Sequence, residues 1–336
     1  MHFGQIVSER MHVFLVLTVY LHGAVQCTSS FVFYKFPTYI CKPYLKFTWN
    51  LCVMFAKSLD LKPESLTYGF EFEFIGTSRL SARKRFQEYM ERHCIPYVFT
   101  GKYGINETNA WTLGADSSVG GEKTGKLSDN GLFGYEMVSP ILHTTDFNQI
   151  EIILSGIQNI LDGQVNETCG THVHFGNLVG LTHKDPLRNG NTVSSFMDSV
   201  VWLYSKLQPF LFNNLVKKDR GWNPFCGRYI DGMYEKNKYL ALTSRGIHGT
   251  LEVRLHHGTL YAHEIIQWAE VNAKFLIYCA KNGPHVSLPS VPSYLENGDM
   301  DKGSLIPVMT NLLVQFGYDE QSANHLIVER ISNRDD

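Results

Sequence analysis

The sequence predicts an α+β protein in which an antiparallel sheet is covered by helices on one face. Segments with apolar residues at alternate positions, which is typical of half-buried strands, occur at 66–76, 135–142, 169–176 and 249–260. Segments with helical spacing occur at 81–94, 147–163, 193–215 and 262–283. The strands come in pairs with helices between them rather than in a regular β-α-β order, and this favours the α+β class.

Local signals predict the first elements. Residues 66–76, LTYGFEFEFIG, place a Phe at every second position, which is the side-chain period of a strand. Residues 81–94 have helical spacing and begin with Ser81, a residue type that favours the helix N-cap. Residues 97–104 and 111–119 are predicted to be strands around a turn, and the Gly/Ser-rich segment 114–134 a loop.

The later elements follow in the same way. The strand at 135–142 is stopped by Pro140, and the helix at 147–163 ends on Gly163. The segment 193–215 is predicted to be one long helix that bends at Pro209. The strand at 249–260 shows strict alternation, the helix at 262–283 is amphipathic and ends on Gly283, and a last helical stretch covers about 304–330.

Three parts of the chain are expected. Residues 1–64 are aromatic-rich and irregular, contain no dense polar site, and are treated as an N-terminal extension. The clear strand and helix patterns occupy 65–283, where we expect the catalytic domain. Residues 284–336 form a Pro-rich linker and a C-terminal helical segment.

Composition limits the function classes. The chain has 336 residues, a net charge of −2 and 44% hydrophobic residues, so we expect a large packed core and no dedicated nucleic-acid binding. Seven widely spaced cysteines favour a reducing, cytoplasmic location over a disulfide framework. The apolar segment 11–27 resembles the hydrophobic region of a signal peptide, and leaves a targeted or secreted protein as the alternative. It is too short and too interrupted by His for a membrane span, which needs roughly 20 apolar residues.

Three of the predicted strands repeat one chemical pattern. Side chains two positions apart on a strand point the same way, about 6.6–7 Å from each other. One face of each strand is apolar, and the other carries side chains of the types that bind metals and anions. These side chains are Glu71 and Glu73, then His172 and His174, then Glu252 and Arg254 with His256 beyond them, and Glu136 adds a carboxylate from a fourth segment.

If these strands are neighbours, their carboxylates converge on one surface. Carboxylates that close do not all stay ionised without a cation, because their repulsion raises their pKa values. Oxygen ligands with an imidazole suit Mg²⁺ or Mn²⁺ better than Zn²⁺. Arg254 among the acids indicates an anion as well, and a carboxylate-bound cation with an arginine is the arrangement of phosphate chemistry.

Simpler interpretations stay open. A lone His-x-His is more often structural, and Glu252 with Arg254 also fits a surface ion pair worth under about 1 kcal/mol. A zinc hydrolase that uses His172 and His174 is a competing function, and a catalytically inactive binding protein of the same fold is another.

The order of the motifs resembles the amidoligase family, part of the carboxylate–amine ligase superfamily that contains glutamine synthetase and glutamate–cysteine ligase. The motifs are GFEFEF, WTLGADSS at 111–118, YEMVSPIL, CGTHVHFG and GTLEVRLHHGTL, and the likeness covers roughly 66–280. The resemblance implies a curved, mainly antiparallel half-barrel sheet with helices packed on the convex face, as in the glutamine synthetase catalytic domain.

The resemblance also implies roles for individual residues. Metal ligands would be Glu71, Glu73, Glu136, His172 and Glu252. Arg254 would stabilise the transferring phosphoryl group, His174 would lie nearer the nucleotide, and Arg228 and Arg245 would contact phosphate or substrate. Asp116 is similar to a recurrent family Asp without a clear role.

The implied activity is an ATP-dependent carboxylate–amine ligase. ATP with Mg²⁺ or Mn²⁺ would convert a substrate carboxylate to an acyl phosphate, which an amine attacks to form an amide. The substrates would be small molecules or peptides. The extension over 1–64 has no counterpart in the resemblance, and the sequence leaves the two substrates and the oligomeric state open.

Overall fold

The structure is a computed structural model that describes residues 62–101, 109–120, 132–177, 195–209, 211–217, 240–245, 250–282 and 302–333. The chain divides into two compact units, Met1–Asn50 and Leu51–Asp336, and all described residues belong to the second. Nearly all of the predicted extension, including the segment 11–27, therefore lies outside the described residues, as does Arg228. No helix in the described part of the chain has the length and apolar character needed to cross a membrane.

A seven-stranded sheet forms the centre of the second unit. Its order is β2-β3-β4-β1-β5-β7-β6. The strands are β1 (Thr67–Thr77), β2 (Tyr97–Phe99), β3 (Trp111–Ala115), β4 (Leu132–Val138), β5 (Gly170–Gly176), β6 (Leu242–Arg245) and β7 (Thr250–His257). All neighbouring strands are antiparallel except β2 and β3. The predicted α+β class is confirmed, while the half-barrel curvature and the likeness to glutamine synthetase stay predictions.

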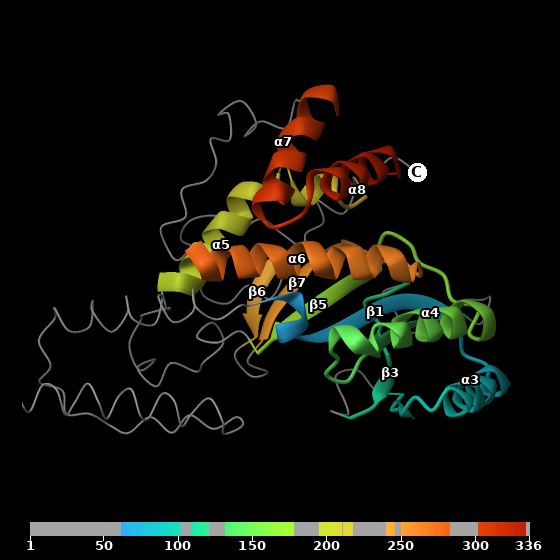
Figure 1. Cartoon of the computed structure of the whole chain (residues 1–336). Coiled ribbons are helices and arrows are strands. Elements are labelled where there is room, and N and C mark those ends of the chain that lie inside the picture. The colour runs from blue at the N-terminus through green and yellow to red at the C-terminus, as the bar shows by residue number, and fades with distance from the viewer. Residues whose placement is uncertain are drawn as a thin grey trace, which may run out of the picture. The chain divides into compact units, whose positions relative to one another are not determined.

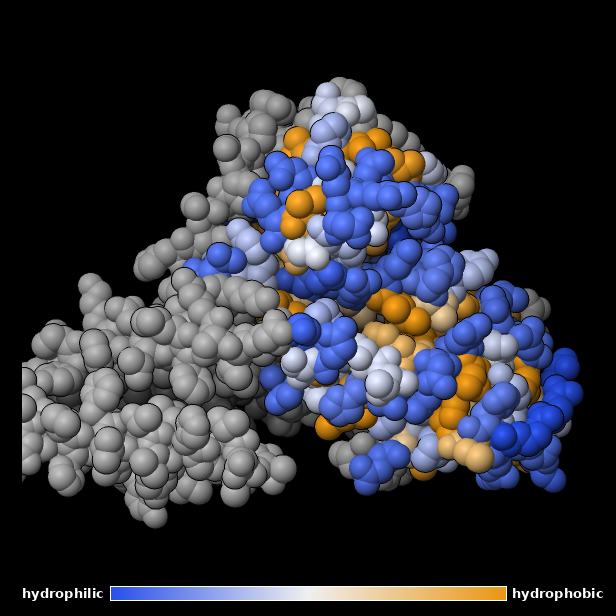
Figure 2. All heavy atoms as spheres, viewed as in Figure 1, coloured by the Kyte–Doolittle hydropathy of each residue, from blue (hydrophilic) through white to orange (hydrophobic). Residues whose placement is uncertain are grey.

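Helices pack against one face of this sheet, where α6 and α4 cross the strands (Figure 1). The α-helices are α3 (Leu80–Arg92), α4 (Asn148–Ile160), α5 (Ser195–Leu207), α6 (Ala262–Asn282), α7 (Lys302–Gln315) and α8 (Glu320–Asn333). Short 3₁₀ turns are η1 (Pro63–Ser65), η2 (Thr144–Asp146) and η3 (Phe212–Asn214). On the side viewed in Figure 2, hydrophobic residues are interspersed with hydrophilic ones.

The alternation of β1 fixes which face of the sheet meets the helices. Phe70, Phe72 and Phe74 are at most 1% exposed and belong to the hydrophobic core. Phe72 stacks on Trp111 of β3 at 5.9 Å between ring centroids, and Phe70 meets Phe147 before α4 edge-on at 5.7 Å. Burial of such aromatic side chains is the main driving force for this layer, at about 1.5–3 kcal/mol each. The residues between them therefore face the other side of the sheet.

Several predicted elements differ in the structure. The long helix predicted at 193–215 is wrong, because α5 ends at Leu207, two residues before Pro209, and the chain continues into η3. The last helical stretch is two helices, separated by Gly317, whose positive φ of 98° suits a residue without a Cβ. The expected strands at 97–104 and 111–119 are parallel neighbours rather than a turn-linked pair.

A register shift in β7 changes one predicted face. Thr171 pairs with His256 but Val173 pairs with Val253, so β7 holds one residue more than β5 over this stretch. His256 consequently shares the helix-covered face, where its ring lies 5.2 Å from that of Trp268 in α6. The prediction that His256 lies on the face of Glu252 and Arg254 is wrong, because strict alternation does not continue through a bulge.

Candidate active site

Strand pairing brings the predicted metal-ligand types together on the face opposite the helices. Direct cross-strand pairs are Glu71 with His172, Glu73 with Glu136, and His174 with Glu252. These pairs lie on β4, β1, β5 and β7, which are consecutive in the sheet. Side chains that pair directly on one face are close neighbours, so the register alone concentrates six ligand-type groups.

Glu71 is the centre of this arrangement, since each of its oxygens meets a different imidazole. His172 Nδ1 lies 2.8 Å from Glu71 Oε2, and His174 Nε2 lies 3.0 Å from Glu71 Oε1. Burial alone would raise the pKa of Glu71, but these two hydrogen bonds outweigh it and hold the pKa well below the usual value. Glu71 is therefore ionised at neutral pH.

Glu252 and Arg254 form a buried ion pair on β7. The Glu252 side chain is fully buried, and Arg254 Nη1 donates to its Oε1. Burial would raise the pKa of Glu252, but the nearby His172, His174 and Arg254 lower it. The interpretation of this pair as a plain surface contact does not fit, because both side chains are largely withdrawn from water.

Glu73 and Glu136 form the second acidic part of the face. The backbone N–H of Gly170 donates to Glu73 Oε2 at 2.6 Å, which fixes that carboxylate. Burial, followed by the charges of Glu71, Asp116 and Glu73, raises the pKa of Glu136 to about 9. Without a cation, Glu136 would consequently keep its proton at neutral pH.

Asp116 joins this second part from the end of β3. It is 3% exposed, and both the backbone N–H and the hydroxyl of Ser118 donate to its Oδ1, at 2.8 and 2.6 Å. Asp116, Glu73 and Glu136 each offer an oxygen within 4.8 Å of the others. The sequence had assigned no role to Asp116, and the structure places it among the candidate ligands.

Three overlapping groups have the spacing needed to hold a metal ion. They are Glu71–Glu136–His172, Glu71–His174–Glu252 and Glu73–Asp116–Glu136. Cis ligands of an octahedral ion are about 3 Å apart, which matches the 3.0 Å between His174 and Glu71. His172 is 2% exposed, and its buried Nε2 has no hydrogen-bond partner among the described residues. Excess carboxylates, a raised pKa at Glu136 and this orphaned nitrogen all fit divalent cations.

The side chains of the two other predicted arginines, Arg228 and Arg245, are not described. Arg245 ends β6, but its side chain is not described, and Arg228 lies outside the described residues. Sequence reasoning missed two residues that hold the site. Ser118 orients Asp116, and Thr250 Oγ1 lies 3.2 Å from His174 Nδ1. The Asp-x-Ser spacing after β3 is typical of a turn, and Thr250 lies two residues before Glu252, so both carry signals in the sequence.

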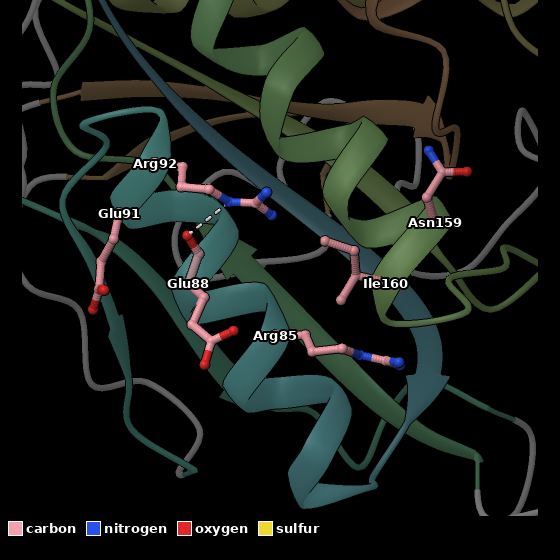
Figure 3. A pocket seen from close by; sticks show the side chains of 6 residues that line it. All are labelled: Arg85, Glu88, Glu91, Arg92, Asn159 and Ile160. Carbon is pink, nitrogen blue, oxygen red and sulfur yellow. Dashed lines mark hydrogen bonds between the residues drawn. The ribbon is translucent and has the colours of Figure 1, made fainter.

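A separate pocket of about 850 Å³ lies between α3 and α4 (Figure 3). Its lining residues are Arg85, Glu88, Glu91, Arg92, Asn159 and Ile160. Figure 3 shows Arg85 and Arg92 on α3, with Asn159 and Ile160 on the facing part of α4. Its charged side chains are exposed, and it contains none of the residues of the acidic face, so it offers sites for control substitutions.

The mixed sheet thus carries clustered carboxylates and imidazoles on its open face, with the spacing of candidate metal ligands. Residues 64–245, more than half of the chain, match the family model described as "Putative amidoligase enzyme", and the chain belongs to this family. No curated protein matches the chain in a sequence search. Membership indicates an amide-bond-forming ligase, and β7 with Glu252 and Arg254 lies just beyond the matched residues.

Proposed function

We propose that the protein is an ATP-dependent carboxylate–amine ligase that works through an acyl phosphate. The observation that carries this proposal is the convergence of four glutamates from three strands, with Arg254 beside them. Glu71 and Glu73 lie on β1, Glu136 on β4 and Glu252 on β7. Family membership supplies the class of bond that is formed. The ATP dependence rests on the chemistry of this face.

The acid-rich face suits a nucleotide only if cations accompany it. Four carboxylates repel a triphosphate, and bound Mg²⁺ or Mn²⁺ would neutralise both the acids and the phosphate oxygens. Glu71, Glu252 and His172, whose Nδ1 lies 2.8 and 3.6 Å from oxygens of the two carboxylates, would hold one ion. Glu73, Glu136 and Asp116 would hold another. These residues lie on strands, except Asp116, which directly follows β3 and is held by Ser118, and this keeps their positions fixed during a reaction.

Arg254 supplies the positive charge that does not depend on a metal. Burial would lower its pKa, but the charge of Glu252 and the hydrogen bond to that carboxylate raise it, so the guanidinium stays charged. Glu252 fixes its direction through this contact. In this position Arg254 would stabilise negative charge on the phosphoryl group as it moves from ATP to the substrate carboxylate.

Amide formation then follows from leaving-group chemistry. A carboxylate is a poor electrophile, and phosphorylation converts one of its oxygens into a good leaving group. The amine nitrogen attacks the acyl carbon, the C–N bond forms, and inorganic phosphate leaves with the C–O electron pair. The products are the amide, ADP and phosphate. Small-molecule or peptide carboxylates and amines are the substrates that this scheme requires.

The zinc hydrolase receives less support from the geometry. None of the three candidate metal groups among the described residues contains both His172 and His174, although each imidazole contacts Glu71. A two-histidine zinc site would also leave Glu73, Glu136 and Arg254 without a role. The inactive binding protein differs from the ligase only in turnover, which the activity assay decides.

The test is amine-dependent ADP release by the full chain, screened with pools of carboxylates and amines. We expect Glu73→Ala and Arg254→Ala to abolish it, with losses of at least about 100-fold. Matched controls are Glu88→Ala and Arg85→Ala, which remove the same charges from the exposed pocket between α3 and α4 and should leave the rate unchanged. Full turnover in either site variant refutes its assigned role.

A further inference from the structure

We propose that Glu264 and Arg330 are positioning residues that fix the carboxylate of Glu73 from outside the acidic face. They act through the β7–α6 turn, residues 258–261, and through the peptide group between Cys169 and Gly170. The inference rests on the proposed function only for the effect of a misplaced Glu73 on the reaction, because the contacts themselves are independent of any reaction. Glu264 and Arg330 both lie beyond residues 64–245, the segment that matches the family model.

One peptide group connects the β7–α6 turn to the acidic face. The backbone N–H of Gly258 donates to the carbonyl of Cys169 at 2.9 Å. In the same peptide group, the N–H of Gly170 donates to Glu73 Oε2 at 2.6 Å. A trans peptide group is planar, so its C=O and N–H point in opposite directions and turn together. If the Cys169 carbonyl leaves Gly258, the Gly170 N–H therefore also turns away from Glu73.

The turn and Cys169 are packed without space between them. A Cβ at Gly258 would lie only 2.5 Å from the Cβ of Cys169, so the close approach of the two backbones requires a glycine here. Cys169 is 1% exposed, and its backbone N–H donates to the carbonyl of Asn166 at 3.0 Å. A displacement of the β7–α6 turn is consequently passed on to the Cys169–Gly170 peptide group.

Glu264 holds the turn on both sides of Gly258. The hydroxyl of Thr259 donates to Glu264 Oε2 at 2.6 Å, and His257 Nε2 lies 3.7 Å from the same oxygen. The other ring nitrogen of His257 accepts a hydrogen bond from the backbone N–H of Lys217 at 3.2 Å. One carboxylate near the start of α6 therefore restrains the residues before and after Gly258.

Arg330 holds Glu264 in turn, from α8. Its Nη1 lies 3.5 Å from Glu264 Oε1, the oxygen that faces away from Thr259 in the bonding pattern. Its Nη2 donates to the carbonyl of Glu264 and to Gln267 Oε1, each at 2.9 Å. The Arg330 side chain is only 8% exposed, and a guanidinium with several bonds at fixed directions orients its partners more strictly than a single charge does.

The expected result of breaking this chain of contacts is a Glu73 carboxylate with more than one orientation. The bond from Gly170 is short and charge-assisted, so its loss removes a strong restraint on the side chain. Misplacement of a reacting or supporting group by about 1 Å can cost up to about 100-fold in rate. A positioning role therefore predicts a lower kcat with little change in the KM for ATP.

The experiment measures hydrogen exchange of the Gly170 amide in the full chain by mass spectrometry, in a peptide that covers residues 166–172. Thr259→Val removes the hydroxyl at similar volume, and Arg330→Met removes the guanidinium but keeps an apolar stem. Each should speed exchange of this amide about 5- to 10-fold, as expected for the loss of about one hydrogen bond. Thr259→Ser keeps the hydroxyl and should exchange like the wild type.

Gly156→Ala is the matched control for a general loss of stability. It disturbs the packing of α4 on Phe86 of α3 and touches no residue of the network, so exchange of the Gly170 amide should stay at the wild-type rate. If Thr259→Val and Arg330→Met also exchange at the wild-type rate, the inference is overturned. Equal acceleration in Gly156→Ala overturns it as well, because exchange would then report unfolding of the whole unit.

Amine-dependent ADP release separates this inference from the proposed function. With an active wild type, Arg330→Met should lower kcat about 10-fold at an unchanged KM for ATP, and an unchanged kcat overturns the positioning role. If the wild type releases no ADP but the exchange results hold, the proposed function fails while the control of Glu73 by the β7–α6 turn is supported. Thermal unfolding identifies variants that do not fold, and Thr259→Val with Thr259→Ser carries the test if Arg330→Met is one of them.

Discussion

Replacing Glu136 by Gln tests the link between the acidic cluster and its cations. The pKa of Glu136 is raised to about 9, first by burial and then by the charges of Glu71, Asp116 and Glu73. At pH 7.5 such a group is more than about 95% protonated. A divalent cation that binds its carboxylate must displace this proton. Metal binding to the wild type should therefore release about one proton from Glu136.

Calorimetry in two buffers of different ionisation enthalpy measures this number. We expect Mn²⁺ binding at pH 7.5 to release about one proton more from the wild type than from Glu136→Gln, which has no proton to lose. The histidines of the face are present in both proteins, so their contribution cancels in the difference. Equal proton release in the two proteins would refute the reasoning, because Glu136 would then be ionised before the metal arrives or remote from it.

The same pKa predicts the pH dependence of metal-free stability. A carboxyl whose folded-state pKa is raised contributes stability that is complete below pH of about 4.5 and is lost as the pH rises toward 9. From pH 5.5 to 7.5 the wild type should lose at most about 2–3 kcal/mol relative to Glu136→Gln, at about 1.4 kcal/mol per pH unit. Partial exposure of the side chain reduces this value. Urea denaturation at each pH measures the difference, and saturating Mn²⁺ should remove it.

Three further substitutions test the packing around the sheet. Burial alone would raise the pKa of Glu264, but its hydrogen bonds and the charge of Arg330 lower it to about 2. Glu264→Gln should therefore cost up to about 3 kcal/mol of unfolding free energy at pH 7. Urea denaturation should show this loss shrinking as the pH falls from 5 to 2. Gly156→Ala places a Cβ 2.8 Å from Phe86 and should cost about 1–3 kcal/mol, with unchanged Mn²⁺ affinity by calorimetry. Trp111→Ala empties a fully buried position and should cost about 3–5 kcal/mol in the same denaturation assay. Wild-type stability in any of these variants would contradict the packing described.

The face of the sheet on which each β1 side chain lies was predictable, because successive side chains of a strand point to opposite faces. Once Phe70, Phe72 and Phe74 are recognised as core residues, Glu71 and Glu73 must point the other way. Two acids can therefore lie within an otherwise apolar strand, because helices cover only one face of the sheet and the opposite face is open to polar groups. The residue pattern alone did not predict which strands are neighbours in the sheet. That expectation came only from the resemblance of the motif order to a known family.

Pairing details were not predictable, because they depend on the partner strand. The extra residue in β7 is visible only against β5, and it turns His256 toward Trp268. The parallel pairing of β2 with β3 is likewise visible only once both strands are placed in the sheet. Asp116 lies just after β3, where the alternation of the strand no longer indicates which way a side chain points.

The placement of β7 gives the strongest reason to treat the acidic face as one functional unit. The family match ends at residue 245, before this strand, yet β7 lies between β5 and β6 and separates two strands that the match includes. Its Glu252 is fully buried among His172, His174 and Arg254. An ionised carboxylate at such a depth is costly unless neighbouring positive groups or cations compensate it. Three strands from the matched segment, β4, β1 and β5, and β7 from outside it thus supply a single compensated cluster. This is the arrangement expected if that cluster binds cations and a phosphate-bearing substrate.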